Sequence, residues 1–352
     1  MNEVALNAEE SRVYQLDGVR CIAVMLVLFG HSYGVGWWAN SDWLAGFGVR
    51  VFFVLSGFLI TGILLRSQTG SLVRDAKVFY LRRFLRIFPL YYLIISVAFA
   101  AGMPTHLASP FYFYYFNELA ARGQSAGPLN PFWSLCVEEQ FYLICPLLIW
   151  KTPRRIVPHV LVALIIGSAA TGLFFAHFRT FYNEKMLTVV CAQFLMCGAL
   201  ASYVDWKHGA KVNADKCLLV GLGGLLLTFA VNTQIQFYTL LLQSIFLAFM
   251  ILGLKRTSNK VALSVFKFRP FVYIGQISYG LYSYHELGFV IAVSVISLYP
   301  ALGLMTGPIF AFLLTMIIAT LSYYWFETPI NKLKRFFPYQ HGPKPDAVQP
   351  VM

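Results

Sequence analysis

The chain has 352 residues, of which 58% are hydrophobic and only 12% are charged. A soluble domain carries about twice that charged fraction, so the composition excludes an ordinary soluble protein and predicts an all-α, polytopic membrane protein. The formal net charge of +12 would suit nucleic-acid binding only on a basic soluble module, and the chain has no room for one, so we exclude nucleic acid as a partner.

About ten apolar segments are long enough to span a membrane as helices. The seventh is short, and the ninth contains polar residues. We predict one membrane domain over residues 1–335 and a short, Pro-rich, disordered cytoplasmic tail over residues 336–352. The ten segments cover residues 18–35, 47–65, 86–103, 132–150, 158–177, 187–204, 217–232, 236–254, 271–295 and 303–326.

Basic residues alternate between the loops that connect these segments. One set of loops, together with the two ends of the chain, contains 22 of the 27 Lys and Arg residues. The other set contains only Arg50, Arg122, Arg179 and Lys185. Because cytoplasmic loops of membrane proteins carry the excess of basic residues, the alternation predicts that both termini are cytoplasmic. Most of the net charge is therefore explained by topology.

Arg20 and His31 lie eleven residues apart in the first apolar segment. Eleven residues make about three helical turns, so both side chains project from one face, roughly 16 Å apart along the axis. Ionisable groups at membrane depth are costly and usually mark a functional path. Two simpler interpretations stay open: Arg20 snorkels to the interface and pairs with Asp17, and His31 bonds a backbone carbonyl.

The second and third segments each contain a polar motif. Ser56 and Gly57 lie within the second, where small residues permit close helix packing. Arg83 and Arg86 lie three residues apart at the predicted start of the third. Two guanidiniums on one helix face can hold phosphates through forked hydrogen bonds. The alternative is that both are flanking cations of a cytoplasmic helix end.

The fourth segment begins with Trp133 and Ser134 and carries two adjacent carboxylates, Glu138 and Glu139. Carboxylates near a helix N-terminus can act merely as electrostatic caps, together with Ser134. The alternative is that one carboxylate orients an imidazole or takes part in proton transfer.

These segments together resemble the acyltransferase-3 family of integral membrane proteins. The resemblance runs from about residue 14 to residue 335. The main departure is Cys136, where a small residue such as Ser or Ala is commoner in the family. The motifs that carry the resemblance lie at residues 16–32, 51–61, 82–89, 132–142, 277–285 and 326–330.

The family transfers acyl groups, often acetyl, to hydroxyls of carbohydrates and related cell-surface or secreted molecules. Some members carry a fused extracytoplasmic esterase-like domain, and we expect this chain to be of the stand-alone type. The Arg-x10-His pattern of the family falls on Arg20 and His31, its Arg-x-x-Arg pattern on Arg83 and Arg86, and its acid on Glu138. The resemblance thus implies catalytic roles for His31, Glu138 and Arg20, donor binding by Arg83, Arg86 and Arg82, and substrate binding by Ser56 and Trp133.

The resulting hypothesis is a multi-pass O-acyltransferase of the plasma (bacterial inner) membrane, with cytoplasmic acyl-CoA, expected to be acetyl-CoA, as donor. The expected partners are this donor, membrane lipids and a carbohydrate or lipid-linked glycan acceptor. His31 is the predicted general base, since an unperturbed imidazole has a pKa of about 6.5. Glu138 is expected to hold its tautomer, as an acid does in a triad, and an acyl-histidine relay is a variant.

The alternative function is a proton-coupled transporter or flippase of a glycan or lipid, since ionisable residues within spans suit proton-coupled transport. The lack of a clear internal repeat weakens this hypothesis. A purely structural membrane subunit would not need several spaced polar motifs. No metal is expected, because the six cysteines contain no CxxC pair and fit buried free thiols better.

Overall fold

The computed structural model describes most of the chain as a bundle of long helices. The aromatic residues 111–116, for which the sequence predicts an outer interfacial belt, and most of the predicted tail at 336–352 lie outside the described residues. All six cysteines are described and are free thiols, and five of them are buried, as expected. The described residues are 13–32, 42–67, 69–100, 121–123, 127–178, 184–230, 236–298 and 306–340.

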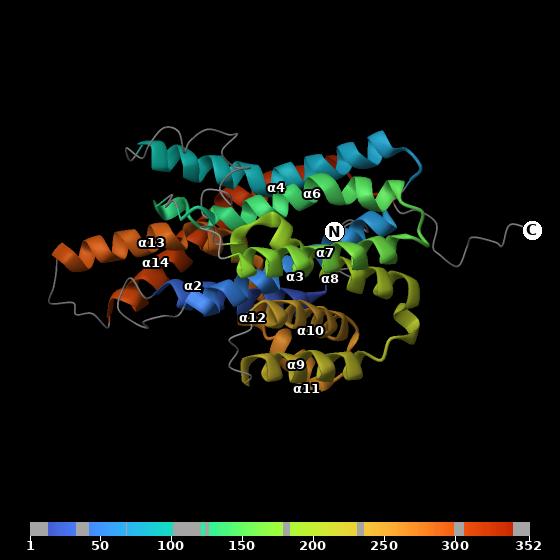
Figure 1. Ribbon diagram of the computed structural model, residues 1–352. Helices are drawn as coiled ribbons and strands as arrows, with labels where there is room; N and C mark the ends of the chain where they lie inside the picture. Colours follow the sequence, from blue (N-terminus) through green and yellow to red (C-terminus); the bar gives the residue numbers. More distant parts are fainter. Residues whose placement is uncertain are drawn as a thin grey trace, which may run out of the picture.

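The described residues form α-helices joined by short turns, with a π-helical stretch at Tyr323–Glu327. The long helices lie side by side (Figure 1). The α-helices are α2 (Tyr14–His31), α3 (Asp42–Arg66), α4 (Leu72–Ala100), α6 (Phe132–Lys151), α7 (Val157–His177), α8 (Thr188–His208), α9 (Ala214–Ala230), α10 (Gln236–Arg256), α11 (Lys260–Phe266), α12 (Arg269–Gln276), α13 (Ser278–Leu298), α14 (Thr306–Ser322) and α15 (Thr328–Lys332).

The all-α, polytopic architecture predicted from composition is confirmed. The described part of each of the ten predicted segments is helical, and 8 helices among the described residues are long and apolar enough to cross a membrane. The other two are α9, with 17 residues, and α2, which contains Asp17 and Arg20 within its 18 residues.

Two predicted boundaries are wrong. The third segment was predicted to begin at residue 86, but α4 begins at Leu72, so the arginine motif lies inside a helix. The early turns are held against the bundle by Phe79, which is completely buried, while Arg74 and Lys77 are exposed. The ninth segment is not one helix, because the chain bends at Ile277 between α12 and α13. The short α12 lies against α2, where the backbone of Asp17 fills the place of a side chain at Gly275.

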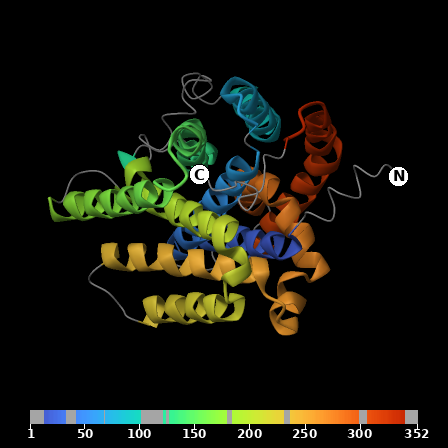
Figure 2. The ribbon, with the colours of Figure 1, turned by 90° about the vertical axis from the view of Figure 1, so that its right-hand side faces the viewer.

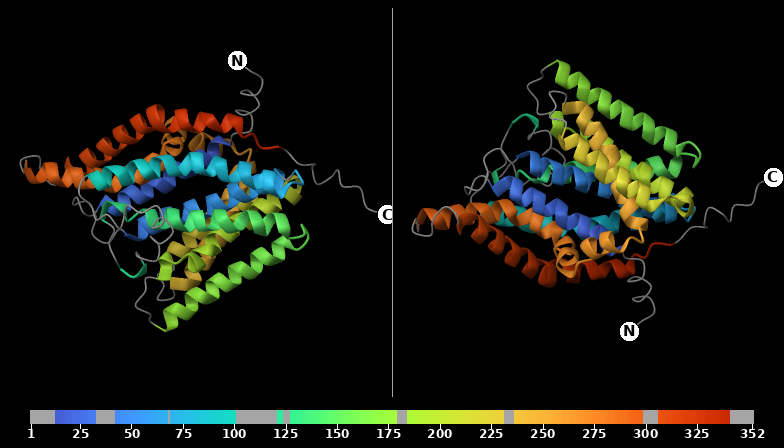
Figure 3. Two further views of the ribbon diagram at one scale, coloured as in Figure 1. Left: turned by 90° about the horizontal axis from the view of Figure 1, so that it is seen from above. Right: turned by 90° about the horizontal axis from the view of Figure 1, so that it is seen from below.

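The helices differ in how deeply they lie in the bundle. The most apolar parts of α3 and α8 are 72% buried, against 22% for α7. Figure 2 shows the blue α2 and α3 in the middle, with α4, α9 and α14 around them. Figure 3 shows α13 and α14 along one side and α7 along the opposite side. The outer helices therefore present apolar side chains to lipid, and the central ones can hold polar groups.

Close packing of α3 against α8 depends on a glycine. A side chain built on Gly57 would lie 1.9 Å from the carbonyl oxygen of Leu195, so only glycine permits this approach. The predicted packing role of the Ser56–Gly57 pair is therefore confirmed for Gly57.

One end of the bundle collects basic residues around a buried carboxylate. The Asp205 side chain is 0% exposed and pairs with Arg66 at 3.1 Å, and also with Lys255 and Arg256. These four residues come from the ends of α3, α8 and α10. The passages from α3 to α4, from α6 to α7 and from α8 to α9 lie at this end, on the right in Figure 1. The basic loops thus share one end, which is the end predicted to face the cytoplasm.

Candidate active site

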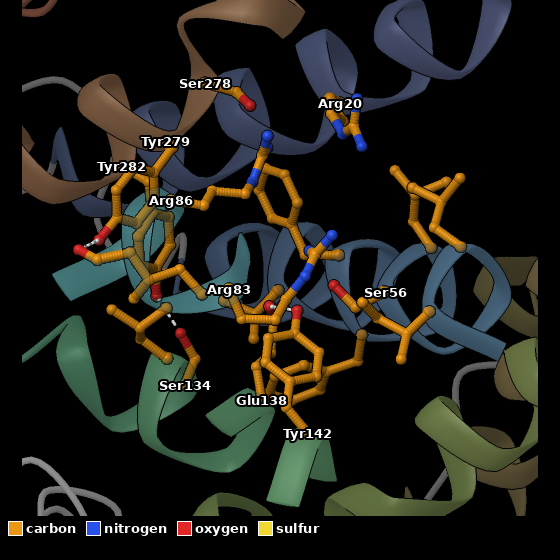
Figure 4. A pocket seen from close by; sticks show the side chains of 18 of the residues that line it. Arg20, Ser56, Arg83, Arg86, Ser134, Glu138, Tyr142, Ser278, Tyr279 and Tyr282 are labelled. Atoms are coloured by element: carbon orange, nitrogen blue, oxygen red, sulfur yellow. Dashed lines mark hydrogen bonds between the residues drawn. The ribbon is translucent and has the colours of Figure 1, made fainter. Parts of the chain in front are cut away.

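A cavity of about 240 Å³ with both apolar and polar lining residues lies between α2, α3, α4, α6 and α13. Figure 4 shows polar side chains from all five helices pointing into it. The cavity brings together five of the eight predicted site residues. Its polar lining consists of Arg20, Ser56, Arg83, Arg86, Ser134, Glu138, Tyr142, Ser278, Tyr279 and Tyr282.

Helix α6 contributes a polar stripe to one wall. Ser134, Glu138 and Tyr142 are spaced four residues apart and therefore lie on one face of the helix. The Tyr142 hydroxyl donates to Oε2 of Glu138 at 2.7 Å, and Ser56 of α3 lies beside both. Ser134 lies 2.5 Å from the Tyr282 hydroxyl (Figure 4). Ser134 and Glu138 are thus parts of the cavity wall, and no side chain caps α6.

Three guanidiniums face the cavity from two helices. Arg20 of α2 donates to buried Asp17 at 2.5 Å, which confirms the pairing considered from the sequence, and it still lines the cavity. The Arg83 guanidinium lies 5.9 Å from the ring centroids of Phe79 and Tyr142, and its buried Nε has no hydrogen-bond partner among the described residues. Arg86 is accessible, and the cavity supplies the space around it.

The wall carries an excess of positive charge. Among the described residues that line the cavity, Arg83 and Arg86 face the single carboxylate of Glu138, while the charge of Arg20 is offset by Asp17. An apolar environment strengthens electrostatic interactions, and an unsatisfied buried donor is costly. The cavity is therefore suited to an anion with several acceptor oxygens.

His31 lies beside a second histidine. Its Nδ1 is 2.8 Å from Nε2 of His285 in α13, and the two rings are nearly parallel, at 10°. Nδ1 of His285 lies 2.6 Å from the carbonyl oxygen of Tyr282. Oε1 of Glu286 lies 3.5 Å from Nδ1 of His31 and 3.7 Å from Nε2 of His285. A polar cluster of two imidazoles and one carboxylate thus lies next to the cavity.

The expected pairing of Glu138 with His31 is not what the structure shows. Glu138 bonds Tyr142, and the partners of His31 are His285 and Glu286. The sequence reasoning placed His285 in a motif without a role and overlooked Glu286. Two adjacent ionisable side chains within the apolar α13 were the signal that could have found them.

Tyr282 connects the cavity with the histidine pair. Its side chain lines the cavity, while its carbonyl accepts the hydrogen bond from His285. The rings of Tyr282 and His285 have centroids 5.7 Å apart. Tyr282 therefore links the cavity that Arg83 and Arg86 line to the histidine pair.

The motifs that build this site are those of a known protein family. Residues 13–326 match the acyltransferase-3 family model, which describes an acyltransferase domain. The chain belongs to this family. No solved structure matches the chain.

The chain is similar along most of its length to two bacterial proteins. The O-acetyltransferase OatA of Staphylococcus aureus (strain NCTC 8325 / PS 47) is 29% identical over 376 residues, covering 94% of this chain and 58% of that protein. The peptidoglycan O-acetyltransferase OatA of Listeria monocytogenes is 30% identical over 368 residues, covering 92% of this chain and 56% of that protein. The chain therefore spans little more than half the length of these relatives.

Two residues that the family resemblance placed in the site lie elsewhere. Arg82 donates to the carbonyl oxygens of Lys334 and Phe337, both at 2.8 Å, and its guanidinium lies 4.5 Å from the Tyr339 ring. Trp133 packs edge-on against Phe53, with ring centroids 6.2 Å apart. Arg82 thus anchors the segment after α15, and Trp133 supports the wall of α3 from behind.

Proposed function

We propose that the protein is a membrane O-acetyltransferase that moves an acetyl group from cytoplasmic acetyl-CoA to a hydroxyl of a carbohydrate acceptor. The observation that carries this proposal is the positive cavity whose wall residue Tyr282 also orients the histidine pair. The similar proteins are an O-acetyltransferase and a peptidoglycan O-acetyltransferase, which supports the reaction and the acceptor class. The excess of basic residues at one end of the bundle supports a cytoplasmic entry for the donor. The proposed location is the plasma (bacterial inner) membrane.

Arg83 and Arg86 are the proposed ligands of the donor phosphates. Guanidiniums bind phosphate oxygens through forked, charge-assisted hydrogen bonds, and Nε of Arg83 has no other partner in the described part of the chain. Arg82 is engaged with two backbone carbonyls, so we assign it to holding the C-terminal segment and not to donor binding. The thin pantetheine arm would then follow the cavity past Arg20 and Ser56 toward Tyr282.

His31 is the proposed general base. The hydroxyl oxygen of the acceptor attacks the carbonyl carbon of the thioester, and its proton passes to His31. The bond between the carbonyl carbon and the sulfur breaks, and His31 returns the proton to the leaving thiolate. The products are the acetyl ester and the free thiol of CoA, so atoms and charge balance without another reactant.

Glu138 has a different proposed role from the one expected from the sequence. Its carboxylate accepts the hydrogen bond of Tyr142 and lies on a wall with three guanidiniums. We assign it to orienting Tyr142 and to balancing the positive charge of Arg20 and Arg86.

The test compares wild-type protein with His31→Ala in proteoliposomes that receive labelled acetyl-CoA and soluble peptidoglycan fragments. We expect acceptor-dependent release of CoA thiol and an acetyl ester on the fragments from the wild type, and neither from His31→Ala. The exposed His159 of α7 supplies the matched control, His159→Ala, which should retain full activity. Uptake of label without release of thiol would instead support a transporter or flippase. Full activity of His31→Ala would show that His31 is not the general base.

A further inference from the structure

We propose that His285 is a positioning residue that holds His31 in the tautomer whose Nε2 accepts the proton of the acceptor hydroxyl. This inference rests on the proposed acetyl transfer and explains how that reaction obtains its base. It assigns to α13 a part of the mechanism that neither the family match nor the relatives' names describe.

The first step is the protonation of His285. Its Nδ1 lies 2.6 Å from the carbonyl oxygen of Tyr282. A carbonyl oxygen can only accept a hydrogen bond, so Nδ1 of His285 carries the hydrogen. In a neutral imidazole the other nitrogen then has a free lone pair, so Nε2 of His285 is an acceptor.

The second step decides which nitrogen of His31 carries the hydrogen. Nε2 of His285 lies 2.8 Å from Nδ1 of His31, and such a contact requires one hydrogen between the two nitrogens. Because His285 accepts, His31 must donate from Nδ1. Nε2 of a neutral His31 is then the unprotonated nitrogen and the base. The backbone carbonyl of Tyr282 thus determines the tautomer of His31 through one intervening ring.

The third step is the rigidity of the intervening ring. The His285 side chain is completely buried, with its ring 5.7 Å from that of Tyr282 and 5.8 Å from that of Phe289. A ring held on two faces cannot easily turn to exchange its two nitrogens. This is the function that a carboxylate performs toward the histidine of a catalytic triad.

Two carboxylates also offset the positive charge that His31 gains on taking a proton. Oε1 of Glu286 lies 3.5 Å from Nδ1 of His31, and Asp42 of α3 interacts with the same imidazole through its charge. Both interactions are electrostatic and leave the hydrogen bond to His285 intact. They stabilise the imidazolium that forms during attack.

His31, His285 and Glu286 are also residue types that bind metals, and their ligand atoms lie within 4.8 Å of one another. The geometry favours the hydrogen bond. Two nitrogens on one tetrahedral zinc ion lie about 3.3 Å apart, given zinc–nitrogen distances of about 2.05 Å. The observed 2.8 Å is the separation of a direct donor and acceptor.

The test uses two amide variants that differ in length. In His285→Gln the amide oxygen reaches the place of Nε2 and can accept from His31, whereas in His285→Asn the amide reaches only the place of Nδ1. We expect kcat to fall about 100-fold or more in His285→Asn with an unchanged KM for acetyl-CoA, and at most about 10-fold in His285→Gln. Equal losses in both variants, or none in either, would overturn the proposal. The melting temperature of each variant separates these effects from unfolding.

A second measurement reads the tautomer without any activity. Nitrogen NMR of histidine-labelled protein in lipid, with His31→Ala used for assignment, should show Nε2 of His31 unprotonated in the wild type and mixed tautomers in His285→Asn. A protonated Nε2 in the wild type, or one bound metal ion per chain by elemental analysis, would overturn the proposal. If the nitrogen signals are as expected but no acceptor-dependent thiol release occurs, the proposed function is wrong and the geometry of the histidine pair still stands.

Discussion

Nδ1 of His31 lies 2.8 Å from Nε2 of His285, although 254 residues separate the two histidines in the chain. Helices α2 and α13 meet at this contact, next to the cavity that Arg83 and Arg86 line from α4. The helix that carries the proposed base and the helix that orients it are therefore at opposite ends of the sequence. A base that depends on this contact requires the whole bundle to assemble first.

Removing the charge of Glu286 should slow the reaction without weakening donor binding. Glu286→Gln keeps the size of the side chain but no longer stabilises an imidazolium at His31, which lies 3.5 Å away. We expect kcat to fall about 5-fold, since a partly exposed charge pair contributes about 1 kcal/mol. Initial rates over a range of acetyl-CoA concentrations measure this change. An increase in KM with constant kcat would place Glu286 in donor binding instead.

Arg83 and Arg86 should act on the affinity for the donor. Arg83→Lys and Arg86→Lys keep the positive charge but cannot make forked contacts, so we expect KM for acetyl-CoA to rise about 10-fold in each. The exposed Arg74 of the same helix supplies the control, Arg74→Lys, which should leave KM unchanged. An unchanged KM in both cavity variants would show that these arginines are only flanking cations of a membrane helix.

Glu138 and Tyr142 can be separated by two near-isosteric changes. Glu138→Gln still accepts the hydrogen bond of Tyr142 but loses its charge, whereas Tyr142→Phe keeps the charge and loses the bond, which is 2.7 Å long. If charge balance on the wall is the role of Glu138, kcat/KM should fall about 10-fold or more in Glu138→Gln and less in Tyr142→Phe. The reverse order would show that the orientation of Tyr142 matters more than the charge.

The approach of α3 to α8 should not tolerate a side chain at Gly57. Gly57→Ala places a methyl group 1.9 Å from the carbonyl oxygen of Leu195, and such overpacking costs about 1–3 kcal/mol. We expect the melting temperature in detergent to fall by several degrees. Gly167→Ala is the matched control, because no atom lies within 4 Å of the added carbon. Equal melting temperatures for the two variants would contradict the close approach.

Much of the fold could be predicted from the sequence because it depends on local properties. An apolar stretch of spanning length must satisfy its backbone within one helix, so the described parts of all ten predicted segments are helical. The alternation of basic loops likewise predicts that particular helix ends lie together, and Arg66, Lys255 and Arg256 do meet around Asp205. The positions of Arg20, Ser56, Arg83, Arg86 and Glu138 in one cavity also agree with the motif-based prediction of a site.

The partners of these residues were decided only by the tertiary structure. Helical spacing says which side chains share a face, but not which distant helix that face will meet. Glu138 therefore has Tyr142 of its own helix as partner, Arg82 binds the segment after α15, and His31 meets His285. The start of α4 at Leu72 and the bend at Ile277 have the same origin, because burial of Phe79 and the contact of Gly275 with α2 are tertiary. Hydrophobicity along the chain determined the helices, and packing between helices determined the chemistry of the site.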